Sequence, residues 1–388
     1  MSTAHDGTAD QPPTLAELIE ALDGWYPPAT AESWDRVGLS CGDPGDRVHR
    51  VLLAVDCVPA TVAEAIDEGA GLLLTHHPLL LSGVHSVAAD TGKGALLHRM
   101  IRAGVAHFAA HTNADVATDG VSTALADRLA LAHCRPLQAD AAPALDHLAV
   151  FVPPADAERL LAALAEAGAG AIGNYTECAF TVEGIGRFRP QPGAQPAAGR
   201  IGELYRAGEL RVSVVLPRSA RDRVLAAMHS AHPYEEVAFE LTEQPRLPSS
   251  TGTGRVGQLP APMPLAAFAE YVLQRLPRTR WGIRVAGRAE QVISRVAVCG
   301  GSGAAYTEDA RRAGADAYLT SDLKHHSTLE SVAELAGLAP ELALLDAAHW
   351  ATEAPWLHVA AGKLRRRFGA LQVLVSEQVT DPWTLHVR

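Results

Sequence analysis

The sequence predicts an α/β protein whose N- and C-terminal segments together form a mixed or parallel α/β core, with a ferredoxin-like α+β domain inserted between them. Two observations lead to this fold class. In both outer parts of the chain, short and mostly apolar segments alternate with helical ones, a pattern typical of parallel strands covered on both faces. The middle part instead has the order strand, helix, strand, strand, helix, strand, which is that of a ferredoxin-like module.

The outer parts supply the elements of the core in two series. In the N-terminal part, apolar and β-branched runs predict strands at 48–57, 71–75 and 105–110, with helices at 14–22, 59–68, 94–103 and 120–131. The C-terminal part repeats this alternation, with strands at 292–298, 315–319, 342–345 and 371–375 and helices from about 304, at 325–336 and at 352–368.

The middle part is bounded by segments with the composition of loops. Its strands are expected at 148–152, 177–183, 209–216 and 237–241, and its helices at 155–167 and 220–229. Residues 138–143 and 243–253 flank it, and the Pro/Gly/Ala stretch 190–199 separates its two central strands. The expected domains are therefore 1–140 and 254–388, as two halves of one unit, and 145–245 as the insertion.

Composition excludes several classes of protein. The 388 residues suggest two to three domains, and 33 basic against 44 acidic residues give a net charge of −11, unlike that of a dedicated nucleic-acid binder, although a local basic patch stays possible. No apolar run reaches the length of a membrane span, and the first dozen residues lack the apolar core of a signal peptide. Five scattered cysteines without a CxxC pair indicate free thiols, so we expect a cytoplasmic protein.

Histidines and carboxylates follow three predicted strands, where ligands of open α/β sheets bind. They are, in chain order, His76 and His77, His111 and Asp115, and His349 and Glu353. Adjacent histidines point in different directions and serve two ions more readily than one, while Glu353 lies four residues after His349, on the same helix face, and could bridge both ions. Taken singly, the histidine pair is more often a surface turn, the His349–Glu353 spacing more often an ion pair, and the segment 111–115 could be an Asx turn. Their coincidence at three strand ends favours a metal site of zinc, manganese or iron.

Six ordered segments resemble the dinuclear-metal-centre hexameric family, the GTP cyclohydrolase 1 type 2 homologues or NGG-one-interacting factor three-like proteins. The segments are ESWDRVGL (32–39), THHPL (75–79), HTNAD (111–115), GGSG (300–303), TSDLKHH (320–326) and DAAHWATE (346–353). The insertion resembles the family's PII/CutA-like domain through GIGRFRPQPGAQP from Gly184, HPYEEVAFEL from His232 and GTGRVGQLP from Gly252. Two positions differ from the family pattern: Arg36 replaces an asparagine and Ser321 a glycine.

The resemblance implies roles for individual residues. The implied ligands of two divalent ions, with zinc expected and manganese or iron as alternatives, are His76, His77, Asp115, His349 and Glu353. The implied catalytic positions, which support the ligands or face a substrate, are His111, Asp322 and His326. The resemblance also implies a toroidal homohexamer. Trp34, Trp350 and Trp356 look exposed beside the site and could be core or interface residues.

Two classes of function follow from this reading. Two ions about 3.5–4 Å apart would favour a bridging hydroxide as nucleophile. The first hypothesis is thus a metal-dependent hydrolase acting on a small nucleotide such as GTP, with His111 or His326 as proton shuttle. The alternative is a non-enzymatic, metal-holding ring that binds a protein or nucleic-acid partner, for which the acidic charge makes nucleic acid the less favoured partner.

Three further motifs carry weaker signals. Residues 252–257 fit GxGxxG but lie between loop-like segments, so a Rossmann fingerprint is rejected. Residues 300–303 could cradle an anion with their N–H groups or simply make a tight turn, and both remain open. The cluster 232–236 is interpreted as a turn.

Overall fold

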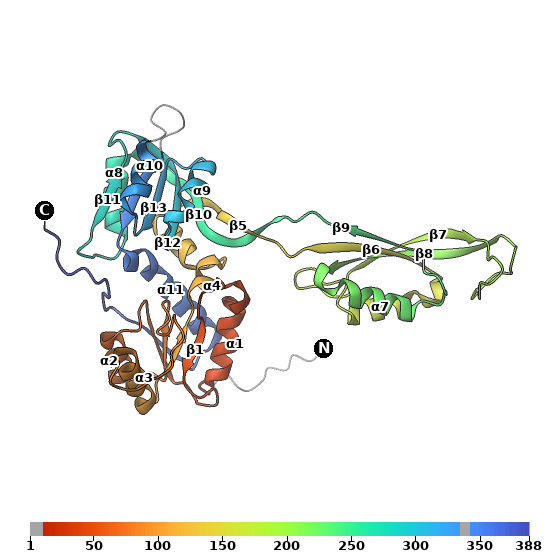
Figure 1. The fold of residues 1–388 in the computed structure, drawn as a ribbon, viewed down its shortest axis with the longest axis horizontal. Coiled ribbons are helices and arrows are strands. Elements are labelled where there is room, and N and C mark those ends of the chain that lie inside the picture. Colours follow the sequence, from red (N-terminus) through yellow and green to blue (C-terminus); the bar gives the residue numbers. More distant parts are fainter. Residues whose placement is uncertain (1–10, 334–341, 388) are drawn as a thin grey trace. The chain divides into compact units, whose positions relative to one another are not determined.

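The computed structural model describes residues 11–333 and 342–387, which separate into two compact units. The first unit joins the chain up to Asp140 with the chain from Ser250 onward, and the second unit is Ala141–Ser249. Figure 1 shows mixed sheets covered by helices in the first unit, which confirms the predicted α/β class.

The first sheet of the larger unit has five strands, four of them parallel. Their order is β1 (Gly38–Cys41), β4 (Ala106–Ala109), β3 (Leu72–Thr75), β2 (Arg50–Ala54) and β15 (Gln372–Val375). Strand β15 pairs in parallel with β2, so the C-terminal part of the chain completes the N-terminal sheet. Alternate residues of the strands face opposite sides of the sheet. Leu52 and Leu73 pack under helices α2 (Pro59–Asp67) and α3 (Gly92–Ala103), whereas Leu53 and Leu72 join the core beneath α1 (Leu15–Trp25) and α11 (His349–Arg367).

The second sheet of this unit has six strands. Their order is β11 (Ile283–Ala286), β14 (Ala343–Ala347), β13 (Ala317–Ser321), β12 (Val292–Ser302), β10 (Pro248–Pro264) and β5 (Ala132–Ala141). The expectation of a loop at 243–253 is therefore partly wrong, because β10 begins at Pro248. The GxGxxG stretch lies inside β10, and no helix directly follows the stretch. Its prolines are tolerated because the pairing with β12 shifts register between Gln258 and Met263.

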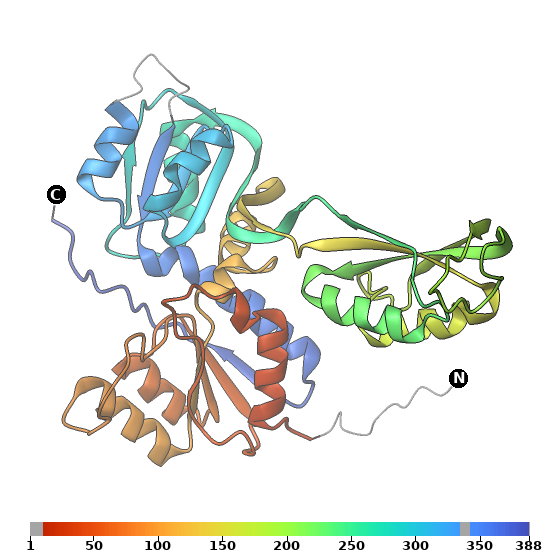
Figure 2. The ribbon, with the colours of Figure 1, turned by 45° about the vertical axis from the view of Figure 1, so that its right-hand side comes forward.

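Helix α11 lies between these two sheets in the views of Figures 1 and 2. It shares one buried core with residues of both sheets, including Leu53 of β2 and Leu345 of β14. The helices of this unit are α1 (Leu15–Trp25), α2 (Pro59–Asp67), α3 (Gly92–Ala103), α4 (Thr112–Val116), α5 (Val121–Arg128), α8 (Leu265–Arg275), α9 (Thr307–Arg312), α10 (His325–Ala333), α11 (His349–Arg367) and the 3₁₀ turns Pro28–Thr30 and Ala304–Tyr306. The end of the helix expected at 325–336 lies outside the described residues.

The second unit has the predicted ferredoxin-like order. Its elements are β6 (Leu145–Val152), the 3₁₀ turn Pro154–Asp156, α6 (Ala157–Glu166), β7 (Ala179–Phe188), β8 (Tyr205–Pro217), the 3₁₀ turn Arg218–Ala220, α7 (Arg221–Ala231) and β9 (Phe239–Glu243). They form an antiparallel sheet ordered β7-β8-β6-β9, with Leu148, Leu160 and Val224 in its core. Strands β7 and β8 extend past the predicted ends into a long hairpin.

Two further expectations concern thiols and membranes. All five cysteines are free. Among the described residues, no helix has the length and apolar character needed to cross a membrane.

Candidate metal centre

The candidate residues lie where strands of both sheets end. His76 and His77 directly follow β3, and their N–H groups donate to Ala54 and Val55 beside it (3.3 and 2.9 Å). Strand β4 leads into α4, which carries Asp115, and His111 precedes that helix. Strand β14 of the other sheet leads into α11, which begins at His349 and carries Glu353 one turn later. The short strands therefore deliver all six side chains to one place.

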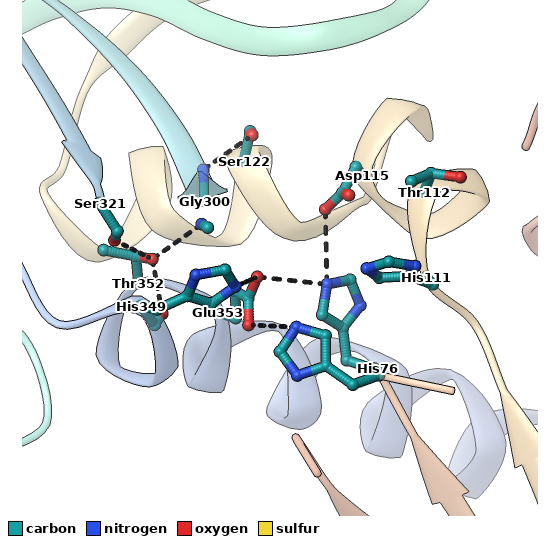
Figure 3. Close-up of polar contacts among 12 residues, drawn as sticks. His76, His111, Thr112, Asp115, Ser122, Gly300, Ser321, His349, Thr352 and Glu353 are labelled. Carbon is teal, nitrogen blue, oxygen red and sulfur yellow. Dashed lines mark hydrogen bonds and ion pairs between the residues drawn. The ribbon is translucent and has the colours of Figure 1, made fainter. Parts of the chain in front are cut away.

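The carboxylate of Glu353 is the centre of the cluster, as Figure 3 shows. Its Oε1 lies 2.9 Å from Nε2 of His349 and 3.4 Å from Nε2 of His76. Its Oε2 lies 3.2 Å from Nε2 of His77. Asp115 Oδ1 approaches Nε2 of His76 at 3.7 Å. Each of the five residues predicted as metal ligands thus contacts at least one other, and Glu353 contacts three imidazoles, as a bridging group would.

Each imidazole of the cluster is oriented by a hydrogen bond at its Nδ1 atom. Nδ1 of His76 lies 2.9 Å from the carbonyl oxygen of Ala110. The remaining three Nδ1 atoms pair with carboxylates, namely His77 with Asp56 (2.7 Å), His111 with Asp35 (2.8 Å) and His349 with Asp322 (2.7 Å). Since a carboxylate or carbonyl can only accept, Nδ1 carries a proton, and Nε2 is the nitrogen that faces the centre, where a cation would replace any proton that it carries.

The centre leaves buried polar atoms without hydrogen bonds. These atoms are Nε2 of His76, Oδ1 of Asp115 and Oε2 of Glu353, all in the described part of the chain. An unsatisfied buried polar atom is costly, so three of them in one cluster fit a site that binds a cation. Two groups have ligand atoms within 4.8 Å of one another and could hold a metal ion: His76, His77 and His111, and His77, His349 and Glu353. Imidazole with carboxylate suits a first-row divalent ion.

The charges of the cluster are strongly coupled. Burial opposes protonation of His77 and His349, yet the negative charge of Glu353 outweighs it and raises the pKa of His77 to about 11 and that of His349 to about 10. Burial likewise disfavours ionisation of Glu353, but the neighbouring imidazoles hold the pKa of this carboxyl well below its usual range. Glu353 is therefore a permanent anion, and the centre attracts positive charge.

His111 and Asp115 behave differently from the rest. Burial, with the positive charge of His76, lowers the pKa of His111 to about 4, so this imidazole stays neutral at physiological pH. Burial raises the pKa of Asp115 to about 6. His111 was assigned from the sequence as a proton shuttle, but its geometry equally makes it a sixth candidate ligand.

The backbone at Gly301 lies so close to the centre that a side chain there would collide with its residues. A Cβ atom at this position would lie 2.4 Å from Oε1 of Glu353 and 3.1 Å from Nε2 of His349, and its φ of +66° disfavours other residues. Its N–H donates to the hydroxyl of Thr352 (2.9 Å), and its carbonyl accepts from Thr320 (2.9 Å). The N–H of Gly300 is likewise used, by Ser122 (3.3 Å). These two N–H groups are engaged inside the protein, which favours close packing over an anion cradle.

The remaining candidates lie further from Glu353. Asp322 is an exposed residue whose observed partner is Nδ1 of His349, so it orients this imidazole. His326 is exposed at the start of α10, and its ring packs on His325 with centroids 5.2 Å apart. The expectation that Trp350 and Trp356 are exposed is wrong, because both are buried and Trp356 packs against His76. Trp34 is 54% exposed, with its edge on His111.

Sequence reasoning did not identify Asp35 and Asp56 as partners of the histidines. Asp35 lies within the WDR segment, and the structure shows it accepting hydrogen bonds from both His111 and Thr112. The unusual Arg36 beside it leaves these contacts in place and donates to the Asp35 carbonyl. The unusual Ser321 contacts Thr352 through its hydroxyl (3.2 Å). The WDR motif was the available signal for Asp35, whereas Asp56 has none beyond its place after β2.

Comparison with known proteins agrees with the motifs. The family model described as Duf34/NIF3 (NGG1p interacting factor 3) matches residues 13–382. The chain belongs to the Duf34/NIF3 family. It is 48% identical over 378 residues to a Mycobacterium leprae protein named GTP cyclohydrolase 1 type 2 homolog, and the match covers 96% of both chains. A Bacillus subtilis protein of the same name is 36% identical, over 95% of this chain and 97% of the relative.

Two solved structures share the fold of this chain. A Bacillus cereus protein related to NIF3 is 34% identical, with a TM-score of 0.72 over 96% of this chain and 99% of that chain. A Staphylococcus aureus protein is 28% identical, with a TM-score of 0.80 over 97% of this chain and 99% of that chain. The family predicted from the six motifs is thereby confirmed.

Proposed function

We propose that this Duf34/NIF3 protein holds two divalent metal ions per chain and is a metal-dependent hydrolase. The observation that carries the proposal is that three buried atoms of the cluster, Nε2 of His76, Oδ1 of Asp115 and Oε2 of Glu353, have no hydrogen-bond partner. One ion would be held by His77 and His349, and the other by His76 and Asp115, with Glu353 shared between them. Zinc is the expected metal, with manganese and iron as alternatives, because imidazole and carboxylate ligands accept all three.

The protein's own groups have defined tasks in such a reaction. Two bound divalent ions would lower the pKa of a water molecule toward neutrality and polarise the bond under attack. Asp56 and Asp322 fix the tautomers of His77 and His349, which keeps both Nε2 atoms directed inward. His111, whose Nδ1 proton is held by Asp35, presents Nε2 to the same centre and would accept a proton there.

The substrate class comes from the relatives. Curated proteins that are 48% and 36% identical are named GTP cyclohydrolase 1 type 2 homolog, so a small nucleotide such as GTP is the first candidate. Assembly as a homohexameric ring is part of the same proposal and follows from the motif resemblance.

Metal analysis and turnover test the proposal together. The purified protein should contain about two ions per chain by elemental analysis, and hydrolysis of a nucleotide panel should disappear on chelation and return with metal. Glu353→Gln should lose most of the metal, whereas Glu308→Gln, on exposed helix α9, should keep it. His111→Ala distinguishes the two roles of this residue, since a proton acceptor would cost turnover alone and a ligand would cost metal.

Two results would contradict the proposal in different ways. A folded Glu353→Gln protein with a full metal complement would show that the centre is assigned to the wrong residues. A protein that binds two ions but turns over nothing in the panel would favour the non-enzymatic, metal-holding alternative.

A further inference from the structure

A cavity of about 400 Å³ opens beside the metal centre, within the larger unit. His77 and His349 form part of its lining. Three tryptophans, Trp281, Trp350 and Trp383, form other parts of it, which is half of the six tryptophans in the chain. Such a concentration of one rare aromatic residue around one cavity makes a surface suited to a flat apolar face.

The segment after β15 builds one wall of this cavity. It is tied to the sheet by the N–H of Ser376, which donates to the carbonyl of Leu53 (2.8 Å). Further along, the hydroxyl of Thr380 donates to Asp56, the same carboxylate that holds His77. Trp383 then packs on Trp281, with ring centroids 5.5 Å apart. The wall is thereby connected through one carboxylate to a candidate metal ligand.

The carboxylates of the cavity are engaged or enclosed within the protein. They are Asp56, Asp322 and Asp381, and the described lining of the cavity contains no lysine or arginine. Asp56 and Asp322 are already engaged by the imidazoles of the centre. Oδ2 of Asp381 is buried without a hydrogen-bond partner, and so is the indole N–H of Trp281. Because both of these atoms are enclosed by the protein, a ligand in the cavity would meet the tryptophan rings rather than these polar groups.

We propose that this cavity is the substrate subsite of the metal centre and that it accepts the flat ring of a heterocyclic substrate against its tryptophans. This inference rests on the proposed function, since it assigns the substrate class to the same centre.

Binding measurements on the metal-loaded, full-length protein test the subsite. The probes are adenosine, guanosine and cytidine as flat rings, with ribose 5-phosphate and tripolyphosphate as ring-free controls, and calorimetry measures affinity. Trp383→Ala should weaken the ring probes by about 10-fold, the value of one base–tryptophan stacking contact. It should leave the ring-free probes unchanged, because these meet only the metal centre.

The C-terminal segment provides a matched control. Leu385 lies two residues beyond Trp383, is 76% exposed and is not part of the cavity lining, so Leu385→Ala should bind every probe as the parent protein does.

Metal content separates this inference from the proposed function. Ring binding that is unchanged in Trp383→Ala, with two ions still present, would overturn the subsite and leave the metal centre standing. Ring binding that depends on Trp383 in a protein found to hold no metal would support the cavity and overturn the proposed function. An equal loss of ring and ring-free probes in Trp383→Ala would overturn the subsite, since it would show that the tryptophan supports the centre rather than the ring.

Discussion

Replacing Gly301 by alanine should damage the metal centre far more than the fold. The added Cβ would lie 2.4 Å from Oε1 of Glu353, about 1 Å short of an ordinary contact. Gly301 cannot easily move away, because its N–H and carbonyl are bonded to Thr352 and Thr320. The carboxylate of Glu353 and the imidazole of His349 must yield instead, and both are proposed ligands.

The expected magnitude has two separable parts. The left-handed backbone of Gly301 costs an alanine about 1 kcal/mol of unfolding free energy. Gly104, at the C-terminal end of α3, has a similar φ of +70° and no atom within 4 Å of the added Cβ, so Gly104→Ala carries this cost alone. Displacing the ligands should add a 10- to 100-fold loss of metal affinity in Gly301→Ala, about the cost of losing a group that orients a ligand.

Two assays read these parts independently. Urea unfolding of the metal-free proteins should give both alanine variants similar stabilities, since bound metal would otherwise add to the folded state. Competition with a chelating dye should then show weakened metal binding in Gly301→Ala alone. A Gly301→Ala protein that binds metal as tightly as Gly104→Ala would refute the argument that this glycine leaves room for the ligands.

Two other predictions concern pH and assembly. Hydrogen bonds from Arg221 and Arg218 lower the pKa of Asp146 below its ordinary value of 3.8. The ionised carboxylate therefore stabilises the second unit above about pH 4, and this contribution is lost as the pH falls through the pKa of the folded state. Asp146→Asn should lower the free energy of unfolding near neutral pH by about 1–3 kcal/mol and make it fall less steeply in acid. Urea unfolding from pH 3 to 7 measures both effects, and a fall as steep as that of the parent protein would contradict the prediction. Light scattering at micromolar concentration should find about six 40.9 kDa chains together, as the family resemblance implies, and a metal-loaded monomer throughout a dilution series would count against the ring.

The sequence predicted which residues gather because their positions depend on simple patterns. His76, His111 and His349 each follow a short apolar strand, and the carboxyl ends of such strands are where loops meet. Glu353 follows His349 by one helical turn, which places both side chains on one face whatever the rest of the fold. These are local rules, so they hold without knowing which strand neighbours which.

The groups that orient the histidines depend on long-range contacts and were not predictable in this way. Asp56 meets His77 across neighbouring strands, and Thr380 reaches Asp56 from more than 300 residues away along the chain. Strand β10 was missed for a different reason. Its prolines and glycines have the composition of a loop, and its pairing with β12 and β5 makes it a strand.

The exchange of strands between the two halves of the larger unit bears on how the centre forms. Strand β15 from the C-terminal half completes the first sheet, and β5 from the N-terminal half lies at the edge of the second. The centre is divided in the same way, with His76 and His77 from the first half and His349 and Glu353 from the second. Neither half can assemble the ligand set by itself, so metal binding would stabilise the joined unit and report on its completion. The cavity beside it has the same dependence, because Asp56 belongs to one half and Trp383 to the other.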